Sequence, residues 1–436
     1  MKKICALLAL FLFSSNAMGA GELSLTILQE NMNAIFLTLA AALVLLMQLG
    51  FAFLEAGICR SKNVVNIMMK NFVDIGLSVF VFWAVGYALL YGNNFSGFFG
   101  SSHFFLSGVE DSDYAFVLYQ MMFAATAVTI TSGAMAERTQ FYGYLLSAVI
   151  ITGLIYPVAA SWVWGGANGG QGWLAKMGFI DFAGSSVVHS VGGWVALAGV
   201  LIVGSRTGRF DENGNPMVIL GHNIAFVAFG GIILWVGWFG FNGGSVVGTD
   251  FSLGRAVLVT HMGAAGGLCG IVLLQKLLKQ PVLLVTTING ALGGLVSITA
   301  GAGTMSPVFA LVAGFVGGFV VYFGERLLLK FQVDDVIGAI PVHAFCGVWG
   351  TIAAGLFFHG DLFSIDRVLV QMTGIFAILL WAFLTALAVY YVINAIFGLR
   401  VERRVERRGL DFSEHYEVAY PEFTDVVTHS KKVAVK

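Results

Sequence analysis

The sequence is poor in residues that interrupt or charge a helix. Its 436 residues include 6 prolines and 4 cysteines, and only 11% are Asp, Glu, Lys or Arg. A soluble protein of this length could not bury a chain that is 58% hydrophobic. The composition therefore indicates a polytopic α-helical membrane protein. The formal net charge of −1 gives no reason to expect nucleic acid as a partner.

Cysteine is too scarce to build a disulfide framework. Cys5 lies in an N-terminal leader, which leaves Cys59, Cys269 and Cys346 in or at the ends of apolar segments. An odd number of cysteines without a CxxC pattern argues against a disulfide framework and against a structural zinc site. We expect no metal and no cofactor.

Glycine and long apolar runs are abundant. The 56 glycines are closely spaced in apolar runs, which is typical of helices that pack backbone to backbone. After the leader there are eleven segments of roughly 20 or more apolar residues, so we expect eleven transmembrane helices in an all-α fold. These segments are 32–57, 66–91, 114–136, 140–163, 184–204, 218–241, 254–275, 281–300, 305–328, 336–358 and 368–397.

The first 20 residues have the pattern of a secretory signal peptide. Lys2 and Lys3 precede an apolar run at 4–13, and small residues follow at 17–20. Without this leader the mature N-terminus lies outside, and an odd number of spans then places the C-terminus in the cytoplasm. We divide the chain into a signal peptide at 1–20, a membrane domain at 21–398 and a cytoplasmic regulatory tail at 399–436.

The distribution of basic residues supports this orientation, because Lys and Arg favour the cytoplasmic side. The inner loops and helix ends hold Arg60, Lys62, Lys70, Arg138, Arg206, Arg209, Lys276, Lys279, Arg326 and Lys330. The outer loops hold only Lys176, Arg255 and Arg367. The tail adds Arg400, Arg403, Arg404, Arg407 and Arg408 on the inner side.

Two histidines lie inside apolar segments in nearly identical surroundings. His189 follows Asp181 by eight residues, and His343 follows Asp335 by the same distance. An ionisable side chain at membrane depth is costly and by default marks a pathway. A mirrored pair indicates one site that is built from two halves of a repeated fold.

The order of the spans predicts an inverted repeat. The five spans before residue 205 can be overlaid on the five between 218 and 358, and each histidine lies in the last span of its half. Because five is odd, the second half is inverted, and the eleventh helix is an addition. If Asp181 and Asp335 begin their helices, each histidine lies about 12 Å inside at ~1.5 Å per residue. In a core of roughly 30 Å, about 6 Å would separate them.

Each histidine could instead be a core residue that hydrogen-bonds a neighbouring carbonyl. For a lone intramembrane histidine this alternative is equally good, but the mirrored contexts favour a functional pair. A metal site is not expected, because two imidazoles are too few ligands and no third His or Cys has matching spacing.

The same stretches resemble the ammonium transporter branch of the ammonium transporter/Rhesus family. The resemblance covers nearly the whole mature chain and includes several independent motifs in the same order. One departure is Gly338, because many members have an Asp five residues before the second histidine; this alters the electrostatics expected at the cytoplasmic mouth. The matching segments are 53–57, 134–138, 162–166, 238–245 and the two histidine blocks.

The resemblance implies an outer vestibule in which Trp164, Ser245 and Phe123 bind ammonium, above a gate of Phe123 and Phe241. An indole face attracts a cation by roughly 0.5–2 kcal/mol, and a hydroxyl can accept one of the four ammonium protons. From the residues alone, Trp164 is better explained as an anchor at the membrane interface and Ser245 as a helix cap. Any single one of the 38 phenylalanines is far more often a lipid-facing or packing residue, so the gate assignment rests on position within the motifs.

Asp181 is expected to support the vestibule in two ways. It can cap the free N–H groups at the start of the fifth span, and its charge would lower the energy of a nearby cation. Asp335 would cap the tenth span in the same way.

The expected function is ammonium transport across the cell inner membrane for nitrogen uptake. A bare cation cannot cross an apolar pore cheaply, whereas ammonia loses only hydrogen bonds. His189 and His343 would line that pore. An ammonium sensor with little flux is the alternative, and a Rhesus-type gas channel is a weaker one. There is no hydrolase triad and no phosphate-cradling loop, so we expect no enzyme.

The resemblance also implies partners. Family members form homotrimers with one pore per subunit, and a PII-type signalling protein can block the pores at the C-terminal tail. The tail segment 398–420 resembles that regulatory region. Its arginines could instead be attracted to anionic lipid, and both explanations can hold.

Overall fold

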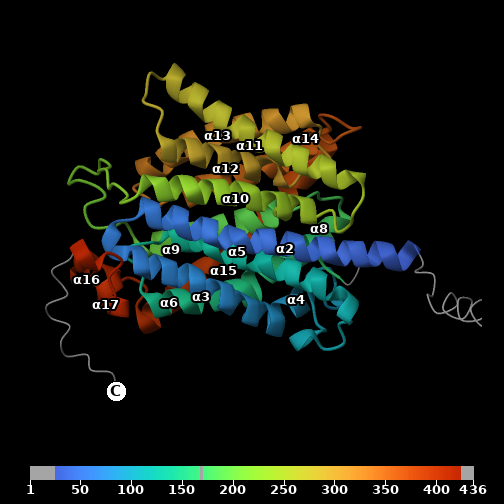
Figure 1. Ribbon diagram of the computed structural model, residues 1–436, viewed down its shortest axis with the longest axis horizontal. Helices are drawn as coiled ribbons and strands as arrows, with labels where there is room; N and C mark the ends of the chain where they lie inside the picture. The colour runs from blue at the N-terminus through green and yellow to red at the C-terminus, as the bar shows by residue number, and fades with distance from the viewer. Residues whose placement is uncertain (1–24, 167–169, 424–436) are drawn as a thin grey trace, which may run out of the picture.

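The described residues form a bundle of membrane-length helices (Figure 1). The computed structural model describes residues 25–166 and 170–423. Within these ranges, nine helices are long and apolar enough to cross a membrane, and two shorter apolar helices complete the eleven. The predicted all-α fold with eleven spans is confirmed. The signal peptide predicted at 1–20 and the end of the tail lie outside the described residues.

The first half of the repeat changes helix type within two of its spans. The π-helical turns η2 and η5 each continue one α-helix into the next without a break. A short antiparallel hairpin, β1 with β2, follows the second span. The elements are α2 (Leu25–Ile58), η1 (Ser61–Asn63), α3 (Val64–Val81), η2 (Phe82–Gly86), α4 (Tyr87–Tyr91), β1 (Asn94–Phe95), β2 (Phe99–Gly100), η3 (Phe104–Leu106), η4 (Asp111–Asp113), α5 (Tyr114–Ala134), α6 (Phe141–Ile150), η5 (Ile151–Ile155), α7 (Tyr156–Trp164), α8 (Trp173–Lys176), η6 (Ser185–Ser190) and α9 (Val191–Val203).

The second half lies beside the first and is followed by one additional long helix (Figure 1). Its elements are α10 (Ile224–Gly244), α11 (Phe251–Leu277), α12 (Leu284–Thr299), α13 (Pro307–Lys330), η7 (Ile340–Phe345) and α14 (Cys346–Leu356). After them come α15 (Ile365–Phe397), α16 (Arg403–Arg408), α17 (Leu410–His415) and η8 (Pro421–Phe423).

Glycine allows the two halves to meet closely. The first helices of the halves, α2 and α10, pack along each other (Figure 1). A Cβ atom added to Gly50 of α2 would lie 3.1 Å from the carbonyl oxygen of Gly230, and one on Gly230 would lie 2.6 Å from that of Gly50. Such spacing leaves no room for a side chain, so the glycine-rich runs set how near these backbones come.

Two predicted boundaries shift for identifiable reasons. The span predicted at 218–241 begins at Ile224, where the side chain of Asn223 accepts a hydrogen bond from the backbone N–H of Phe226 at 3.1 Å. The span predicted at 336–358 begins at Ile340, because the preceding residues form a capping turn. Lys70, counted above with the inner loops and helix ends, is 2% exposed within α3.

The tail folds against one end of the bundle. The Asp411 carboxylate of α17 accepts a hydrogen bond from the backbone N–H of Asn66 at 2.9 Å, and the Leu410 N–H donates to the Asn63 side chain at 3.0 Å. We call this the tail end. The opposite end, where α2 begins and α7 ends, is the cavity end (Figure 1).

Candidate functional site

Both histidines lie on short π-helical turns. His189 belongs to η6, which leads into α9, and His343 belongs to η7, which leads into α14. Such turns occur frequently at functional sites. The apolar periodicity predicted ordinary helix at both positions, so sequence reasoning missed this feature.

Asp181 caps the first of these turns. One carboxylate oxygen accepts a hydrogen bond from the Gly184 N–H at 2.9 Å, and the other accepts from Ser186 and Val187 at 2.8 and 2.9 Å. Helix starts leave such N–H groups without partners, and an Asp side chain satisfies them. Gly184 has a φ of 110°, which residues with a side chain rarely adopt.

Asp335 caps the second turn in the same geometry. Its carboxylate accepts hydrogen bonds from the Gly338 and Ile340 N–H groups at 3.1 and 2.6 Å. Gly338 has a φ of 79° and occupies the position that Gly184 has in the first half. Gly338, where many family members have an Asp, therefore allows the second half to form the same kind of cap as the first.

The structure brings the two imidazoles into direct contact. Nδ1 of His189 lies 3.2 Å from Nδ1 of His343, with ring centroids 5.2 Å apart and an angle of 23° between the rings. Both side chains are buried. One nitrogen must donate and the other accept, so the two rings carry different tautomers. They therefore titrate as one coupled pair.

Two glycines hold the histidine helices together by reciprocal contacts. Each follows one histidine by four residues and packs against the residue that comes after the other histidine. A Cβ atom on Gly193 would lie 2.4 Å from the Ala344 nitrogen, and one on Gly347 would lie 2.3 Å from the Ser190 hydroxyl oxygen. Because the two sequences are nearly the same, the two histidine helices are related by an approximate two-fold axis at the centre.

Stacked phenyl rings cover the pair on its cavity side. The rings of Phe123 and Phe241 are 4.0 Å apart at 19°, and Phe241 lies 5.2 Å from the His189 ring. Trp238 stacks on His189 at 5.0 Å. Phe123 lines a cavity, so the order is cavity, Phe123, Phe241 and the imidazole pair.

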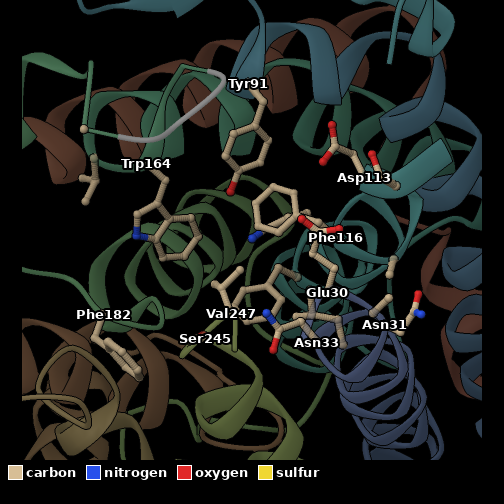
Figure 2. A pocket seen from close by; sticks show the side chains of 18 residues that line it. Glu30, Asn31, Asn33, Tyr91, Asp113, Phe116, Trp164, Phe182, Ser245 and Val247 are labelled. Carbon is tan, nitrogen blue, oxygen red and sulfur yellow. The ribbon is translucent and has the colours of Figure 1, made fainter. Parts of the chain in front are cut away.

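That cavity has a volume of about 810 Å³ and is lined by the three predicted vestibule residues, Trp164, Ser245 and Phe123. Figure 2 shows Trp164 and Ser245 in its wall. The Trp164 indole N–H donates to the Asp181 carbonyl at 2.8 Å, which fixes the ring in the wall. The Ser245 hydroxyl donates to the Phe241 carbonyl at 2.9 Å. Its oxygen also lies 3.2 Å from the Tyr119 hydroxyl, and because a hydroxyl oxygen has two lone pairs, one remains for a further donor.

The electrostatics differ between the two ends of the site. Burial raises the pKa of Asp181 to about 6, although the backbone N–H groups that hydrogen-bond to its carboxylate act in the opposite direction.

Within residues 25–166 and 170–423, no group of three or more His, Cys, Asp or Glu side chains could hold a metal ion.

Carboxylates at the tail end are paired with arginines. Glu137 lies 2.8 Å from Arg206 and 3.0 Å from Arg60, and Asp334 lies 2.8 Å from Arg206 and 3.2 Å from Arg209. Burial alone would raise the pKa of Glu137, but Arg206 and Arg60 lower it to about 2. The pKa of Asp334 is lowered in the same way.

Comparisons with known proteins agree with this geometry. The sequence model of the Ammonium Transporter Family matches residues 35–420. The chain belongs to this family. It is 38% identical over 454 residues to Ammonium transporter Amt2 of Archaeoglobus fulgidus, covering 97% of this chain and 96% of that relative. It is 37% identical to Ammonium transporter 1 member 3 of Solanum lycopersicum, covering 90% and 93%.

Solved structures match as well. The chain resembles a protein named "Sensor Amt Protein" with a TM-score of 0.87 and 33% identity, over 90% of this chain and 100% of that chain. It resembles Mep2 of Candida albicans with a TM-score of 0.78 and 28% identity, over 85% and 86%. The fold and the multi-pass membrane setting are those of the ammonium transporters.

Some residues of this family member's site were not predicted. Trp238 stacks on His189, and Gln120, Tyr91 and Phe182 line the cavity. The Gln120 side-chain oxygen is buried and has no hydrogen-bond partner in the described part of the chain. Gln120 precedes Phe123 by three residues on α5, so helical spacing could have indicated that both share a face.

Proposed function

We propose that the protein carries ammonium across the cytoplasmic membrane for nitrogen uptake. The observation that carries the proposal is the order of the site: a wide cavity, stacked phenyl rings, and a buried imidazole pair. Membership of the Ammonium Transporter Family supports the substrate. The positive-inside distribution supports the orientation, with the cavity end outside and the tail end in the cytoplasm.

Recruitment takes place in the cavity. Ammonium has four donors and no acceptor, so it suits the free lone pair of Ser245. The face of Trp164 attracts the cation by roughly 0.5–2 kcal/mol, depending on desolvation. Asp181, behind the indole, adds a negative charge without touching the ligand. The cation is therefore held weakly enough to leave.

Passage requires the loss of charge. Moving a cation into an apolar conduit costs many kcal/mol, whereas ammonia gives up only its hydrogen bonds. The proton is removed at the Phe123–Phe241 gate and crosses separately by way of the imidazole pair, while ammonia continues through the apolar conduit. K⁺ cannot be neutralised in this way and is rejected.

The imidazole pair gives ammonia hydrogen bonds in transit. If one Nδ1 carries the proton in the contact between the rings, that ring's Nε2 is an acceptor and the other ring's Nε2 is a donor. Nε2 of His189 is buried and has no partner among the described residues. Ammonia, which both donates and accepts, fits this arrangement.

Current recording from reconstituted protein on a solid-supported membrane tests transport. We expect an ammonium-dependent current that Asp181→Ala abolishes, and no current with K⁺. Replacing both His189 and His343 by apolar residues should remove flux or selectivity. Unchanged uptake and K⁺ exclusion in that double variant would contradict the role of the pair.

Two partners belong to this proposal. We propose a homotrimer with one pore per subunit, which the mass of the purified protein in detergent tests. We also propose that a PII-type protein docks at the tail. A pull-down from nitrogen-replete cells that recovers no PII protein would count against this docking.

An ammonium sensor is the second candidate, and one comparison favours it. The matched structure named "Sensor Amt Protein" is covered over its full length. A sensor keeps the vestibule and conducts little. A flat current trace together with tight ammonium binding would decide for the sensor.

A further inference from the structure

In each half of the repeat, a side chain from the fourth span lies beside the glycine of the capped turn. A Cβ atom on Gly184 would lie 3.3 Å from the Trp164 indole, and one on Gly338 would lie 3.1 Å from Oε1 of Glu325. Each glycine precedes its histidine by five residues. Trp164 ends α7, and Glu325 lies near the end of α13, so each comes from the last part of the fourth span of its half. The repeat therefore places Glu325 where the first half places Trp164.

The Glu325 carboxylate has no basic partner. Arg326 is next to it in the chain, but its guanidinium donates to the Tyr322 carbonyl at 3.1 Å and to the Gln280 side chain at 2.9 Å. In the part of the chain that the structure describes, Glu325 takes part in no ion pair. Its neighbour is the Asn289 amide, which donates to Oε1 at 3.4 Å. A carboxylate can accept about four hydrogen bonds, so most of this capacity is left for another donor.

Asn289 connects this carboxylate to the second capped turn. It lies near the start of α12, the third span of its half, just as Gln120 of the cavity wall lies near the start of α5. The Asn289 amide also donates to the Ile337 carbonyl at 3.0 Å. Asn289 is 3% exposed, whereas Glu325 is only partly buried. The bundle therefore holds Glu325 beside the turn and leaves it accessible.

The other carboxylates near this turn are already engaged. Asp335 accepts hydrogen bonds from two backbone N–H groups of the cap. Asp334 is paired with Arg206 and Arg209. A cation at the tail-end mouth of the pore is therefore attracted most strongly by Glu325, because neither an arginine nor a set of capping N–H groups offsets its charge.

We propose that Glu325 binds ammonium at the tail-end mouth of the pore, as the counterpart of Trp164 in the cavity. The inference rests on the proposed transport function. The indole attracts the cation through its π face, whereas Glu325 attracts it by charge and accepts its N–H groups. The two ends therefore bind the same ion by different chemistry. Glu325 sets the ammonium concentration at which flux from the tail end saturates, and the cavity sets that concentration for the other direction.

Binding by a carboxylate also has a consequence for K⁺. This ion is similar in size to ammonium, and a single negative charge attracts both. K⁺ on the tail-end side should therefore compete with ammonium for Glu325, although it cannot pass the pore. The competition should raise the half-saturating ammonium concentration from the tail end.

The test measures saturation separately from each side of the full-length protein. Right-side-out membrane vesicles present the cavity end to added ammonium and inside-out vesicles present the tail end, and both report current on a solid-supported membrane. Glu325→Gln keeps an oxygen for the Asn289 amide but removes the charge. Its half-saturating ammonium concentration should rise about three- to tenfold from the tail end and stay unchanged from the cavity end. Because net flux must vanish at equilibrium, the maximal tail-end current should rise by the same factor.

Matched variants separate the charge of Glu325 from its other contacts. Glu325→Asp keeps the charge and should lie between Glu325→Gln and the wild type. Glu402→Gln removes an exposed acid at the same end of the molecule and should behave as wild type. K⁺ added to inside-out vesicles should raise the half-saturating ammonium concentration of the wild type and leave that of Glu325→Gln unchanged.

Three results would overturn the site. One is a Glu325→Gln protein, folded by its size-exclusion profile, that keeps the wild-type saturation from the tail end. Another is an equal rise from both sides, which indicates a change in the whole pore. The third is a wild type whose tail-end saturation ignores K⁺, a measurement that does not depend on any variant folding. Wild-type vesicles without current in either orientation would instead contradict transport itself.

Discussion

Carboxylates at the two ends of the conduit are used in opposite ways. At the cavity end, burial raises the pKa of Asp181 to about 6, although backbone N–H groups hold its carboxylate, and no basic side chain in the described part of the chain forms an ion pair with it. At the tail end, arginines surround Glu137 and Asp334 and lower their pKa values. A lone buried carboxylate favours a passing cation, whereas a paired one stabilises the loops. In the proposed transport, a carboxylate therefore attracts substrate at one end, whereas the paired carboxylates at the other end stabilise the structure.

The largest expected effect concerns the paired end. Glu137→Gln leaves Arg206 buried with an incomplete partner set, and breaking a buried pair costs about 3–5 kcal/mol. Thermal unfolding in detergent measures this. Asp361→Asn, which removes the partly exposed pair of Asp361 with Arg367, is the control and should cost less than about 1 kcal/mol. Equal losses in the two variants would remove the distinction between the ends.

A smaller effect is expected midway between the ends. Gly193→Ala places a Cβ atom 2.4 Å from the Ala344 nitrogen and forces the histidine helices apart, at about 1–3 kcal/mol. Flux should fall with the separation of the rings. Gly76→Ala on α3, where a Cβ atom would meet nothing within 4 Å, is the control. It should stabilise the helix slightly, by up to about 1 kcal/mol. A Gly193→Ala protein with full flux would contradict the reciprocal contact.

The third prediction concerns the missing acid at the tail end. A Cβ atom on Gly338 would lie 2.8 Å from the Asn289 amide and 3.1 Å from the Glu325 carboxylate, at a φ of 79°. Gly338→Asp should therefore destabilise the fold by about 1–2 kcal/mol, because it adds strain and a like charge. The double variant with Glu325→Gln should recover part of this loss in thermal unfolding. If the double variant recovers nothing, the Glu325 carboxylate is not the source of the like-charge repulsion.

The smallest effect is the pH dependence of stability, which should have opposite signs at the two ends. Asp181 has a raised pKa, so stability falls as pH rises from about 4 to about 6 and then stays constant. Glu137 has a lowered pKa, so its contribution is complete above about 4.5 and is lost as pH falls toward 2. Unfolding of Asp181→Asn across this range should lack the first slope and keep the second. If stability still falls between about pH 4 and pH 6 in Asp181→Asn, another group causes that fall.

The sequence predicted the backbone of the site better than its surroundings. The spacing from Asp181 to His189, repeated from Asp335 to His343, predicted both caps. The periodicity could not predict the π-helical turns, because an apolar run looks the same in either helix type. The neighbours of each ring, such as Trp238 and Phe51, come from distant segments that no local pattern connects.

Charged residues inside the bundle were the hardest to predict. Lys70 was counted with the inner loops and helix ends because lysines usually mark them. Its ammonium group donates to the Thr139 carbonyl and lies over the Tyr144 ring, and these contacts appear only once α3 and α6 are packed. The recurrence of Asn66, Lys70, Asp74 and Ser78 at intervals of four was a signal that could have revealed a buried polar face on α3.

The reciprocal seating of Gly193 and Gly347 has a consequence for biosynthesis. Neither half encloses the proposed pore by itself, because each half supplies only one of the two helices that meet at Gly193 and Gly347. A nascent chain that has not yet emerged past the tenth span contains the first capped turn but nothing to close against it. The proposed pore is therefore complete only when the last of the ten repeated spans is inserted.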